Sequence, residues 1–377
     1  MKIAYVTVSE ILGIPNTGGI QFSKRNIELL GRAFGEKNIF PCVITKEQKN
    51  IEKAVGNTAV FFSAREKVDI LKNALSGRLQ FGREIEDAVL DYLVQHQYDA
   101  VFIDDARMGY LQKRLPDSIF QILFMQNIEK DYIQNRIYAN KAYVVLKKAF
   151  EKNEMLAVQN ADMILSLNYR DALQLKKYYN RTPDLILPIT MDDFFDVQKA
   201  QEYEKRDKEK PAQLLFVGSF FPPNEKSIVW FVENVMPYVT ADFTIVGRGF
   251  EQLEKRLTRK NVHVVGTVGD IAPYYYSSDA VVSPILFGNG MKVKTAEALM
   301  FGKPLFASDE ALEGYDVEGI SGIWRCNNAQ TYIDSIQKHA YAIRRSKYET
   351  GIRKLFLEKY CTNNYVTKIF NSIAGRK

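Results

Sequence analysis

The sequence predicts an α/β protein made of two Rossmann-like, doubly wound domains that face each other across a cleft. Short apolar runs alternate with amphipathic stretches along the whole chain, which is typical of βαβ units around a parallel sheet. The 377 residues exceed one ordinary core, and domains of about 100 to 200 residues favour two of them. A charge-rich stretch, Val197 to Gln213, separates two such series and is interpreted as the interdomain linker.

The first series predicts an N-terminal domain over residues 1–196. An amphipathic helix is expected over Phe22 to Leu30, between the first two strands. The predicted strands are Ile3 to Val8, Phe40 to Thr45, Ala100 to Ile103, Ile119 to Met125 and Met163 to Leu167.

The second series predicts a C-terminal domain over residues 214–360. Its first helix is expected to start at Ser227, because apolar residues recur at helical spacing from Ile228 to Val239. The predicted strands are Leu214 to Val217, Phe243 to Val246, Val262 to Val265, Ala280 to Pro284 and Leu305 to Ala307.

The composition excludes several classes of protein. With 46% hydrophobic and 25% charged residues the chain is globular, and a net charge of +6 is too small to indicate nucleic-acid binding. Three scattered cysteines and three histidines predict neither a disulfide framework nor a metal site nor histidine-based catalysis. No apolar run reaches the ~20 residues of a membrane span. We therefore expect a cytoplasmic protein whose membrane contact would be peripheral.

The stretch FGNGMKVKTAEALMFGKP, Phe287 to Pro304, leads from a strand into an apolar helix. Helix N-termini present unpaired amide groups to anions, and Lys292 adds a full charge there. Glu297 lies roughly 7 Å further along the helix axis, about the step from a phosphate to a ribose, and a carboxylate accepts hydroxyl hydrogens well. Alternatively, Glu297 simply pairs with Lys294 or Lys303.

Three further loops follow strands in the second half. Val217 to Ser227 contains Asn224 and Lys226, where Lys226 could bind phosphate and Asn224 or Ser227 could cap the helix. Val246 to Phe250 reads VGRGF and lacks the third glycine of a dinucleotide-binding motif. Gly266 to Gly269 could offer backbone groups to a flat base or form a plain turn.

The first half has its own candidates at strand ends. Gly18 and Gly19 precede the first helix and permit close backbone approach. Asp104 and Asp105 end one strand and could do acid–base work, although capping the next helix is the alternative. The segment after the next strand supplies Gln126, Asn127 and Glu129.

Taken together, these segments resemble the retaining glycosyltransferases of family 4, glycosyl transferases group 1, which have the GT-B fold. The resemblance is strongest over LLFVGSFFPPNEKSIVWFVENVMPYV and SPILFGNGMKVKTAEALMFGKPLFAS, and looser over TGGIQFSKRNIELL and MQNIEKDYIQNR. It implies that the second domain binds a nucleotide sugar, that no metal or other cofactor is required, and that residues 361–377 form a helix that crosses back to the first domain.

The resemblance also implies roles for individual residues. Glu297 matches the second glutamate of the family's Glu-x7-Glu motif and would hold the ribose, and Asn289 replaces the first glutamate at the donor sugar. Ser219 stands where an arginine is common, and Gln126 where a histidine is common. Asn289 and Lys292 are the predicted catalytic residues. The diphosphate, base and remaining donor contacts would come from Gly290, Met291, Lys292, Val293, Lys226, Ser219, Gly266, Thr267 and Val268, and the acceptor side from Gly18, Gly19, Asp104, Gln126 and Asn127.

The sequence thus predicts a glycosyltransferase that uses a UDP-sugar by default, with a glycan, lipid-linked or protein-linked acceptor, in polysaccharide or glycoconjugate biosynthesis. A non-catalytic GT-B partner or scaffold subunit is the alternative, motivated by Asn289, Gln126 and Ser219. A GT-B epimerase is a third reading. The predicted location is the cytoplasm or the inner face of the membrane.

Overall fold

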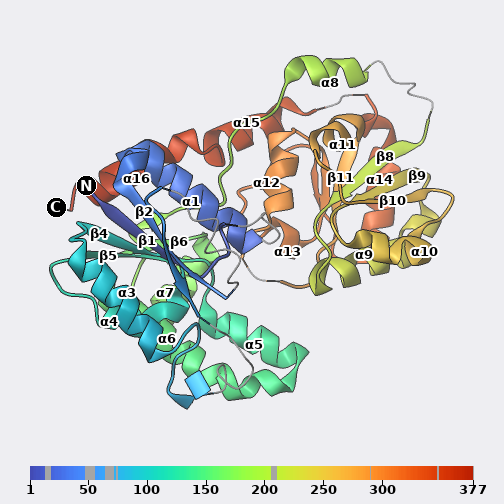
Figure 1. The fold of residues 1–377 in the computed structure, drawn as a ribbon. Coiled ribbons are helices and arrows are strands. Elements are labelled where there is room, and N and C mark those ends of the chain that lie inside the picture. Colours follow the sequence, from blue (N-terminus) through green and yellow to red (C-terminus); the bar gives the residue numbers. More distant parts are fainter. Residues whose placement is uncertain are drawn as a thin grey trace. The chain divides into compact units, whose positions relative to one another are not determined.

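The computed structural model describes residues 1–12, 18–46, 56–63, 72–73, 75–204, 210–288, 290–345 and 348–376. They form two compact units, Met1–Pro188 with Thr362–Lys377 (unit 1) and Ile189–Cys361 (unit 2). Each unit has one parallel sheet with interleaved helices (Figure 1). The predicted fold class, α/β with two Rossmann-like domains, is confirmed.

The sheet of unit 1 has the strand order β3-β2-β1-β4-β5-β6-β7, and all its pairings are parallel. Since the chain runs outward from β1 to β3 and then returns to β4, the strand order reverses between β1 and β4. The strands are β1 (Ile3–Thr7), β2 (Ile39–Thr45), β3 (Ala59–Phe62), β4 (Ala100–Ile103), β5 (Phe120–Met125), β6 (Met163–Ser166) and β7 (Leu185–Ile186).

Seven α-helices accompany this sheet in the described residues: α1 (Gly18–Phe34), α3 (Arg83–Gln95), α4 (Gly109–Lys113), α5 (Glu129–Ala139), α6 (Lys147–Asn160), α7 (Tyr169–Tyr179) and α16 (Asn363–Ala374). Short 3₁₀ helices are η1 (Glu36–Asn38), η3 (Ala106–Met108) and η4 (Lys141–Leu146). The C-terminal α16 packs on α1, where the rings of Phe34 and Phe370 lie 5.3 Å apart.

The sheet of unit 2 has the order β10-β9-β8-β11-β12-β13, again with parallel pairings throughout. Its order reverses between β8 and β11. The strands are β8 (Ala212–Val217), β9 (Ala241–Val246), β10 (Val262–Gly266), β11 (Ala280–Ser283), β12 (Leu305–Ala307) and β13 (Ile323–Arg325).

Helices cover both faces of this sheet, as in other doubly wound folds. They are α8 (Val197–Glu204), α9 (Pro222–Asn234), α10 (Glu254–Leu257), α11 (Ala272–Ser277), α12 (Val293–Met300), α13 (Asp309–Leu312), α14 (Ala329–Ile343) and α15 (Thr350–Lys359), with the 3₁₀ helices η5 (Met236–Tyr238) and η6 (Phe250–Leu253). Among the described residues, no helix is both long and apolar enough to span a bilayer.

Part of the predicted linker is folded. Val197–Glu204 forms α8, whose Ala200 is buried and whose Tyr203 stacks on Tyr276 of α11. The sequence resembles a linker because charged and polar residues surround Ala200 and Tyr203, the two side chains that pack, which lie about one helical turn apart. Residues 205–209 lie outside the described part of the chain.

Two predicted helix starts are also corrected. Helix α9 begins at Pro222 rather than Ser227, with proline at its first positions, where the missing amide hydrogen costs no hydrogen bond. Helix α1 begins at Gly18 rather than Phe22, so both glycines of the TGGI segment are helical. Consequently Gly18 and Gly19 form the first turn of a helix and not a loop before it.

Candidate functional site

In unit 2, the loops after β8 and β11 are neighbours at the carboxyl edge of the sheet. The two strands pair directly through Leu214 with Ala280 and Leu215 with Val281. Doubly wound folds bind ligands beyond the carboxyl ends of strands where the strand order reverses. This edge therefore brings the loop that leads into α9 next to the FGNG loop that leads into α12.

Lys294, on the first turn of α12, ties these loops together. Its Nζ donates to Asn224 Oδ1 on α9 at 2.9 Å and lies 5.3 Å from the ring centroid of Phe216 in β8. The pKa of Lys294 is lowered to about 7, mainly by burial and also by the charge of Lys292, against the opposing effect of Glu297. The sequence analysis considered Lys294 only as a partner for Glu297. Its proximity to Asn224, 70 positions away in the chain, could not be read from spacing.

The start of α12 has the backbone and charge expected of an anion site. Gly290 has a φ of 63°, a left-handed conformation that favours glycine. Lys292 precedes the helix, and its Nζ donates to Gly290 O at 2.6 Å and to Glu310 Oε1 at 2.7 Å. Met291 is buried, and Val293 is the first helical residue. Asn289, predicted to be catalytic, lies outside the described residues.

Glu297 lies on the second turn of α12 and is half-buried. Its Oε2 accepts a hydrogen bond from Tyr275 OH at 2.9 Å. Desolvation raises the pKa of Glu297, against the lowering effects of Tyr275 and Lys294. Lys303, the other partner considered for Glu297, is buried, and its Nζ donates to Ser278 O at 2.8 Å. Tyr275, which the sequence analysis missed, is fixed by stacking on Phe301 with ring centroids 4.5 Å apart.

The loop after β8 places its predicted residues around this edge. Ser219 O accepts a hydrogen bond from Asn224 Nδ2 at 2.7 Å. Lys226 is exposed, and its Nζ lies 5.6 Å from the ring centroid of Phe287, at the start of the FGNG loop. Neither Asn224 nor Ser227 caps α9, because Phe221 occupies that position. Instead, Ser227 Oγ accepts from Leu286 N at 3.1 Å and so joins the two loops again.

The segment Gly266 to Val268 begins at the last residue of β10, the edge strand two places from β8. Gly266 has a φ of 74°, and Thr267 Oγ1 donates to Glu251 Oε1 at 3.3 Å. Glu251 also accepts from Gly249 N at 2.9 Å. Gly249 of VGRGF and Thr267 thus share the carboxylate of Glu251, which packs one loop on the next.

In unit 1, several of the predicted residues lie near the point between β1 and β4 where the strand order reverses. Gln126 Nε2 donates to Asp104 O at 2.9 Å, and a Cβ on Gly19 would lie 3.5 Å from Gln126 Oε1. Asp104 is fully buried and accepts from Thr7 Oγ1 at 3.0 Å and from Ser23 Oγ. Its carboxylate anchors α1 to the sheet from inside and has no exposed surface for a ligand. Burial raises the pKa of Asp104 to about 6. Asn127 is half-buried nearby in the chain.

Asp105 has the capping role that was its alternative. It caps η3 through Arg107 N at 2.8 Å and forms an ion pair with the Arg107 guanidinium. Glu129 is buried, with burial raising its pKa to about 8. Glu154 Oε1 accepts from Glu129 N at 2.6 Å and thereby binds the N-terminus of α5.

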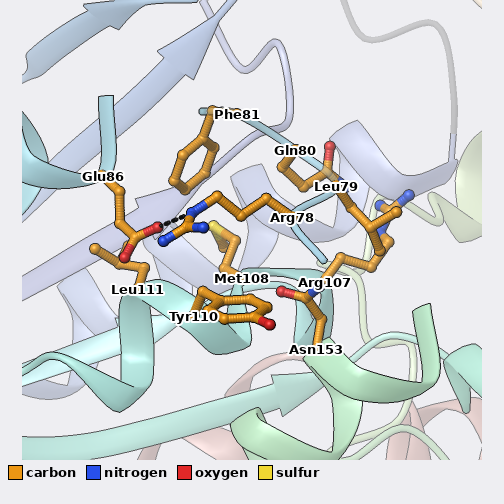
Figure 2. Close-up of a pocket in the computed structure, with 10 residues that line it drawn as sticks. All are labelled: Arg78, Leu79, Gln80, Phe81, Glu86, Arg107, Met108, Tyr110, Leu111 and Asn153. Atoms are coloured by element: carbon orange, nitrogen blue, oxygen red, sulfur yellow. Dashed lines mark hydrogen bonds and ion pairs between the residues drawn. The ribbon is translucent and has the colours of Figure 1, made fainter. Parts of the chain in front are cut away.

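A small pocket in unit 1 lies beside this cluster (Figure 2). Its volume of about 10 Å³ is room for roughly one water molecule. Arg78 crosses it, pairing with buried Glu86 at 2.7 Å and lying 4.8 Å from the ring centroid of Tyr110. Arg78 and Asn153 already bond within the protein, and the space that is left suits nothing much larger than a water molecule.

In the described ranges, His, Cys, Asp and Glu side chains form no group of three able to hold a metal ion. The positive charge around the start of α12 comes from lysines.

Comparison with known proteins finds a family resemblance over the part of unit 2 that contains this edge. Residues 211–340, which contain β8, α9, β11 and α12, match the family model of glycosyl transferases group 1. Over this range the chain is therefore similar to glycosyl transferases group 1. The "Uncharacterized glycosyltransferase" of Methanosarcina mazei is 23% identical over 270 residues, which cover 68% of this chain and 64% of that protein. The match therefore spans just under two thirds of that relative's length.

Solved structures of glycosyltransferases share the whole two-sheet fold. Sucrose-phosphate synthase from Thermosynechococcus elongatus has a TM-score of 0.76 at 14% identity, with 100% of both chains covered. The lipopolysaccharide outer core galactosyltransferase WaaB has a TM-score of 0.69 at 15% identity, also with 100% of both chains covered. Anabaena Alr3699/HepE, solved in complex with UDP and glucose, has a TM-score of 0.66 at 12% identity and 99% coverage of each chain. The two sheets with their helices thus have the GT-B fold of these structures.

Proposed function

We propose that this protein is a metal-independent glycosyltransferase that moves a sugar from a nucleotide diphosphate sugar to a glycan, lipid-linked or protein-linked acceptor. One observation carries the proposal. The start of α12, Lys292 and Lys294 meet at the β8/β11 edge, and Glu297 follows on the same helix. An anion site followed by a carboxylate has the chemistry to hold a diphosphate and then a ribose.

In this mechanism the amides of Gly290, Met291, Lys292 and Val293 hold the diphosphate, and Glu297 accepts the ribose hydroxyls. The backbone of Gly266, Thr267 and Val268 meets the base. The bond from the anomeric carbon to the phosphate oxygen breaks as the acceptor oxygen bonds that carbon, and the hydroxyl proton passes to the departing diphosphate. Attack on the face that the diphosphate leaves retains the anomeric configuration.

Electrostatic stabilisation would fall to the lysines. Charge grows on the diphosphate oxygen as the glycosidic bond breaks, and cations fixed in a partly desolvated site stabilise that charge more than water does. Lys294 and Lys292 are held by Asn224 and Glu310, and Lys226 lies over the ring of Phe287 at the start of the loop. Asn289 is proposed to contact the donor sugar. Ser219, in the loop after β8, is proposed as a further donor contact.

A uridine diphosphate sugar is the favoured donor. The transfer of its sugar to the acceptor would be a step in polysaccharide or glycoconjugate biosynthesis. Support comes from Anabaena Alr3699/HepE, a structural neighbour solved with UDP and glucose. In unit 1, the first turn of α1 with Gly18 and Gly19, together with Gln126 and Asn127, is the proposed acceptor side. Asp104 would act from beneath by fixing Gln126 and α1. We place the reaction in the cytoplasm, at the inner face of the membrane.

A thermal-shift panel with UDP-, GDP-, ADP-, CMP- and TDP-sugars tests the donor assignment. We expect stabilisation by UDP-sugars, slow hydrolysis of the sugar, and release of the α-anomer from an α-linked donor when products are followed by NMR. The variant Glu297→Ala should lose the stabilisation. Stabilisation without turnover in any acceptor screen would favour the non-catalytic partner subunit, and the absence of both signals with every nucleotide would overturn the proposal.

A further inference from the structure

The segment Ile133 to Lys148, which covers most of α5, all of η4 and the start of α6, has an unusual combination of charge and exposure. It contains Arg136, Lys141, Lys147 and Lys148 but no aspartate or glutamate, a net charge of +4 in a chain whose total is +6. Figure 1 shows α5 extending beyond the end of the sheet of unit 1. From Ile133 onward, this projecting part of unit 1 therefore carries four cations and no carboxylate side chain.

Large apolar side chains are exposed on the same segment. Tyr138 is 94% exposed, Val145 63% and Val144 56%. Single exposed apolar residues are common, but neighbouring ones framed by polar groups indicate an interaction site. We refer to Tyr138, Val144 and Val145, with the cations Arg136, Lys141 and Lys148, as the α5–η4 surface.

This surface is held in shape by its own contacts. The guanidinium of Arg136 lies 5.4 Å from the ring centroid of Tyr132 in α5 and 5.3 Å from that of Tyr143 in η4. It therefore joins the helix to the 3₁₀ segment that carries the two valines. Asn140, between them, accepts from Ala142 N at 3.0 Å and fixes the turn.

Acidic side chains near the surface are occupied elsewhere. Asp131 accepts from Tyr178 OH at 2.8 Å, and Glu129 and Glu154 are buried. Glu151 lies 3.9 Å from Lys147, which partly offsets that one cation. Lys141 and Lys148 are exposed. An approaching anionic surface thus meets cations first.

We propose that the α5–η4 surface docks this protein on an anionic lipid bilayer. Tyrosine and valine can enter the headgroup boundary, where amphipathic rings are favoured. Lysine and arginine beside them attract anionic headgroups, each contributing about fivefold in affinity. A protein partner would need complementary acidic groups, whereas a bilayer needs only the apolar centre and cationic rim that the surface presents. The docking does not depend on catalysis and is measured without a donor.

Vesicle co-sedimentation of the full chain tests the charge component. Vesicles of phosphatidylcholine and phosphatidylglycerol should bind, vesicles of phosphatidylcholine alone should bind far less, and binding should weaken as salt rises. The double variant Lys141→Gln/Lys148→Gln should weaken binding about 20-fold to 30-fold. Lys255→Gln/Lys260→Gln, which removes two exposed lysines from unit 2, is the matched control and should leave binding unchanged.

Insertion at this surface has its own readout. The two native tryptophans, Trp230 and Trp324, lie in unit 2, so a Val145→Trp variant reports on the α5–η4 surface after subtraction of the parent signal. Its emission should shift to the blue with anionic vesicles and be quenched by brominated lipid. Val144→Ser/Val145→Ser should weaken vesicle binding at least fivefold, while Tyr238→Ser, at a tyrosine 63% exposed in unit 2, should not.

Four results would overturn the proposal: no vesicle binding, equal binding to both vesicle types, binding that neither set of surface variants weakens, or an unshifted Val145→Trp spectrum in bound protein. Self-association that the same variants abolish, without vesicle binding, would assign the surface to a second copy of the chain. Thermal unfolding of each variant identifies any loss of fold. Failure of vesicle binding leaves the donor thermal-shift result untouched, so the two proposals are tested separately.

Discussion

Lys294 Nζ and Asn224 Oδ1 form a hydrogen bond of 2.9 Å that joins α12 to α9 across the carboxyl edge of unit 2. Asn224 also donates to Ser219 O at 2.7 Å, so one short chain of contacts spans both loops of the proposed donor site. The ammonium therefore has a fixed position next to the start of α12. A diphosphate bound there would meet a cation already in place.

Replacing Lys294 should weaken donor binding more than it harms the fold. Lys294→Met removes the charge and keeps an unbranched side chain. The loss of one charge-assisted contact corresponds to about 1.5–3 kcal/mol, or about 10-fold to 150-fold in the Kd for a UDP-sugar. Calorimetric titration measures it, and Lys338→Met on the exposed side of α14 serves as the control. An unchanged Kd would remove Lys294 from the donor site.

The same lysine makes donor binding depend on pH. Because burial lowers the pKa of Lys294 to about 7, the free protein carries the ammonium below that pH and the neutral amine above it. The phosphates of a UDP-sugar stay ionised over this range, so its Kd should rise about tenfold between pH 6 and pH 8.

The lowered pKa of Lys294 also makes the free energy of unfolding depend on pH. A lysine pKa lowered in the folded state means that burying the ammonium costs stability below pH 7, and that the cost is relieved as pH rises toward 10.5. Relative to Lys294→Met, the unliganded wild type should therefore gain thermal stability between pH 6 and pH 9. A flat Kd and a flat stability difference would together show that Lys294 does not titrate in this range.

Glu297 should confer selectivity for the ribose hydroxyls. A carboxylate that accepts hydroxyl hydrogens contributes about 1.5–3 kcal/mol. We expect wild type to bind UDP about 10-fold to 150-fold more tightly than 2′,3′-dideoxy-UDP and Glu297→Ala to bind both alike. Tyr275→Phe, which removes the hydroxyl that donates to Glu297, should give an intermediate preference. A preference that persists in Glu297→Ala would place the ribose elsewhere.

The sequence predicts an element of this structure well when the pattern that identifies it lies within a few neighbouring residues. The five central strands of unit 1 and five of the six in unit 2 were predicted because buried strands are continuous apolar runs. The missed strands β3, β7 and β13 have two to four residues each and are only partly buried, so their apolar runs are too short to identify a strand. Helix α9 was started five residues late because its first turn consists of prolines and polar residues that carry no apolar stripe.

The same distinction applies to the candidate site. Glu297, Lys292 and Gly290 could be found because a loop, a helix start and a carboxylate follow one another in the chain. Tyr275, Asn224 and Glu310 could not, since their partners lie 22, 70 and 18 positions away and only the sheet order brings them together. Asp104 was predicted to face the acceptor, but its side chain is fully buried and anchors α1 from inside. The sequence does not show whether an aspartate at a strand end is buried or exposed.

Glu310 should limit the affinity for the donor. Its carboxylate pairs with Lys292 at 2.7 Å and so neutralises a cation at the start of α12. Removing the negative charge with Glu310→Gln should tighten binding of UDP about threefold to tenfold at low salt and less at high salt. Lys292→Met should weaken it. Weaker binding in Glu310→Gln would instead mean that the ion pair positions Lys292 for the phosphates.

We predict that the close packing of the loop after β9 on the loop after β8 requires a glycine at position 247. A Cβ at this position would overlap the carbonyl oxygen of Gly218, in the loop after β8, and the φ of 153° is one that L side chains rarely adopt. Backbone atoms cannot move aside as a flexible side chain can, so Gly247→Ala should destabilise the fold by about 2 kcal/mol and lower the unfolding midpoint by about 4–8 °C. Differential scanning calorimetry measures the shift. Gly269→Ala is the matched control, because a Cβ there meets nothing within 4 Å; equal midpoints for the two variants would show that the loop after β9 yields without cost.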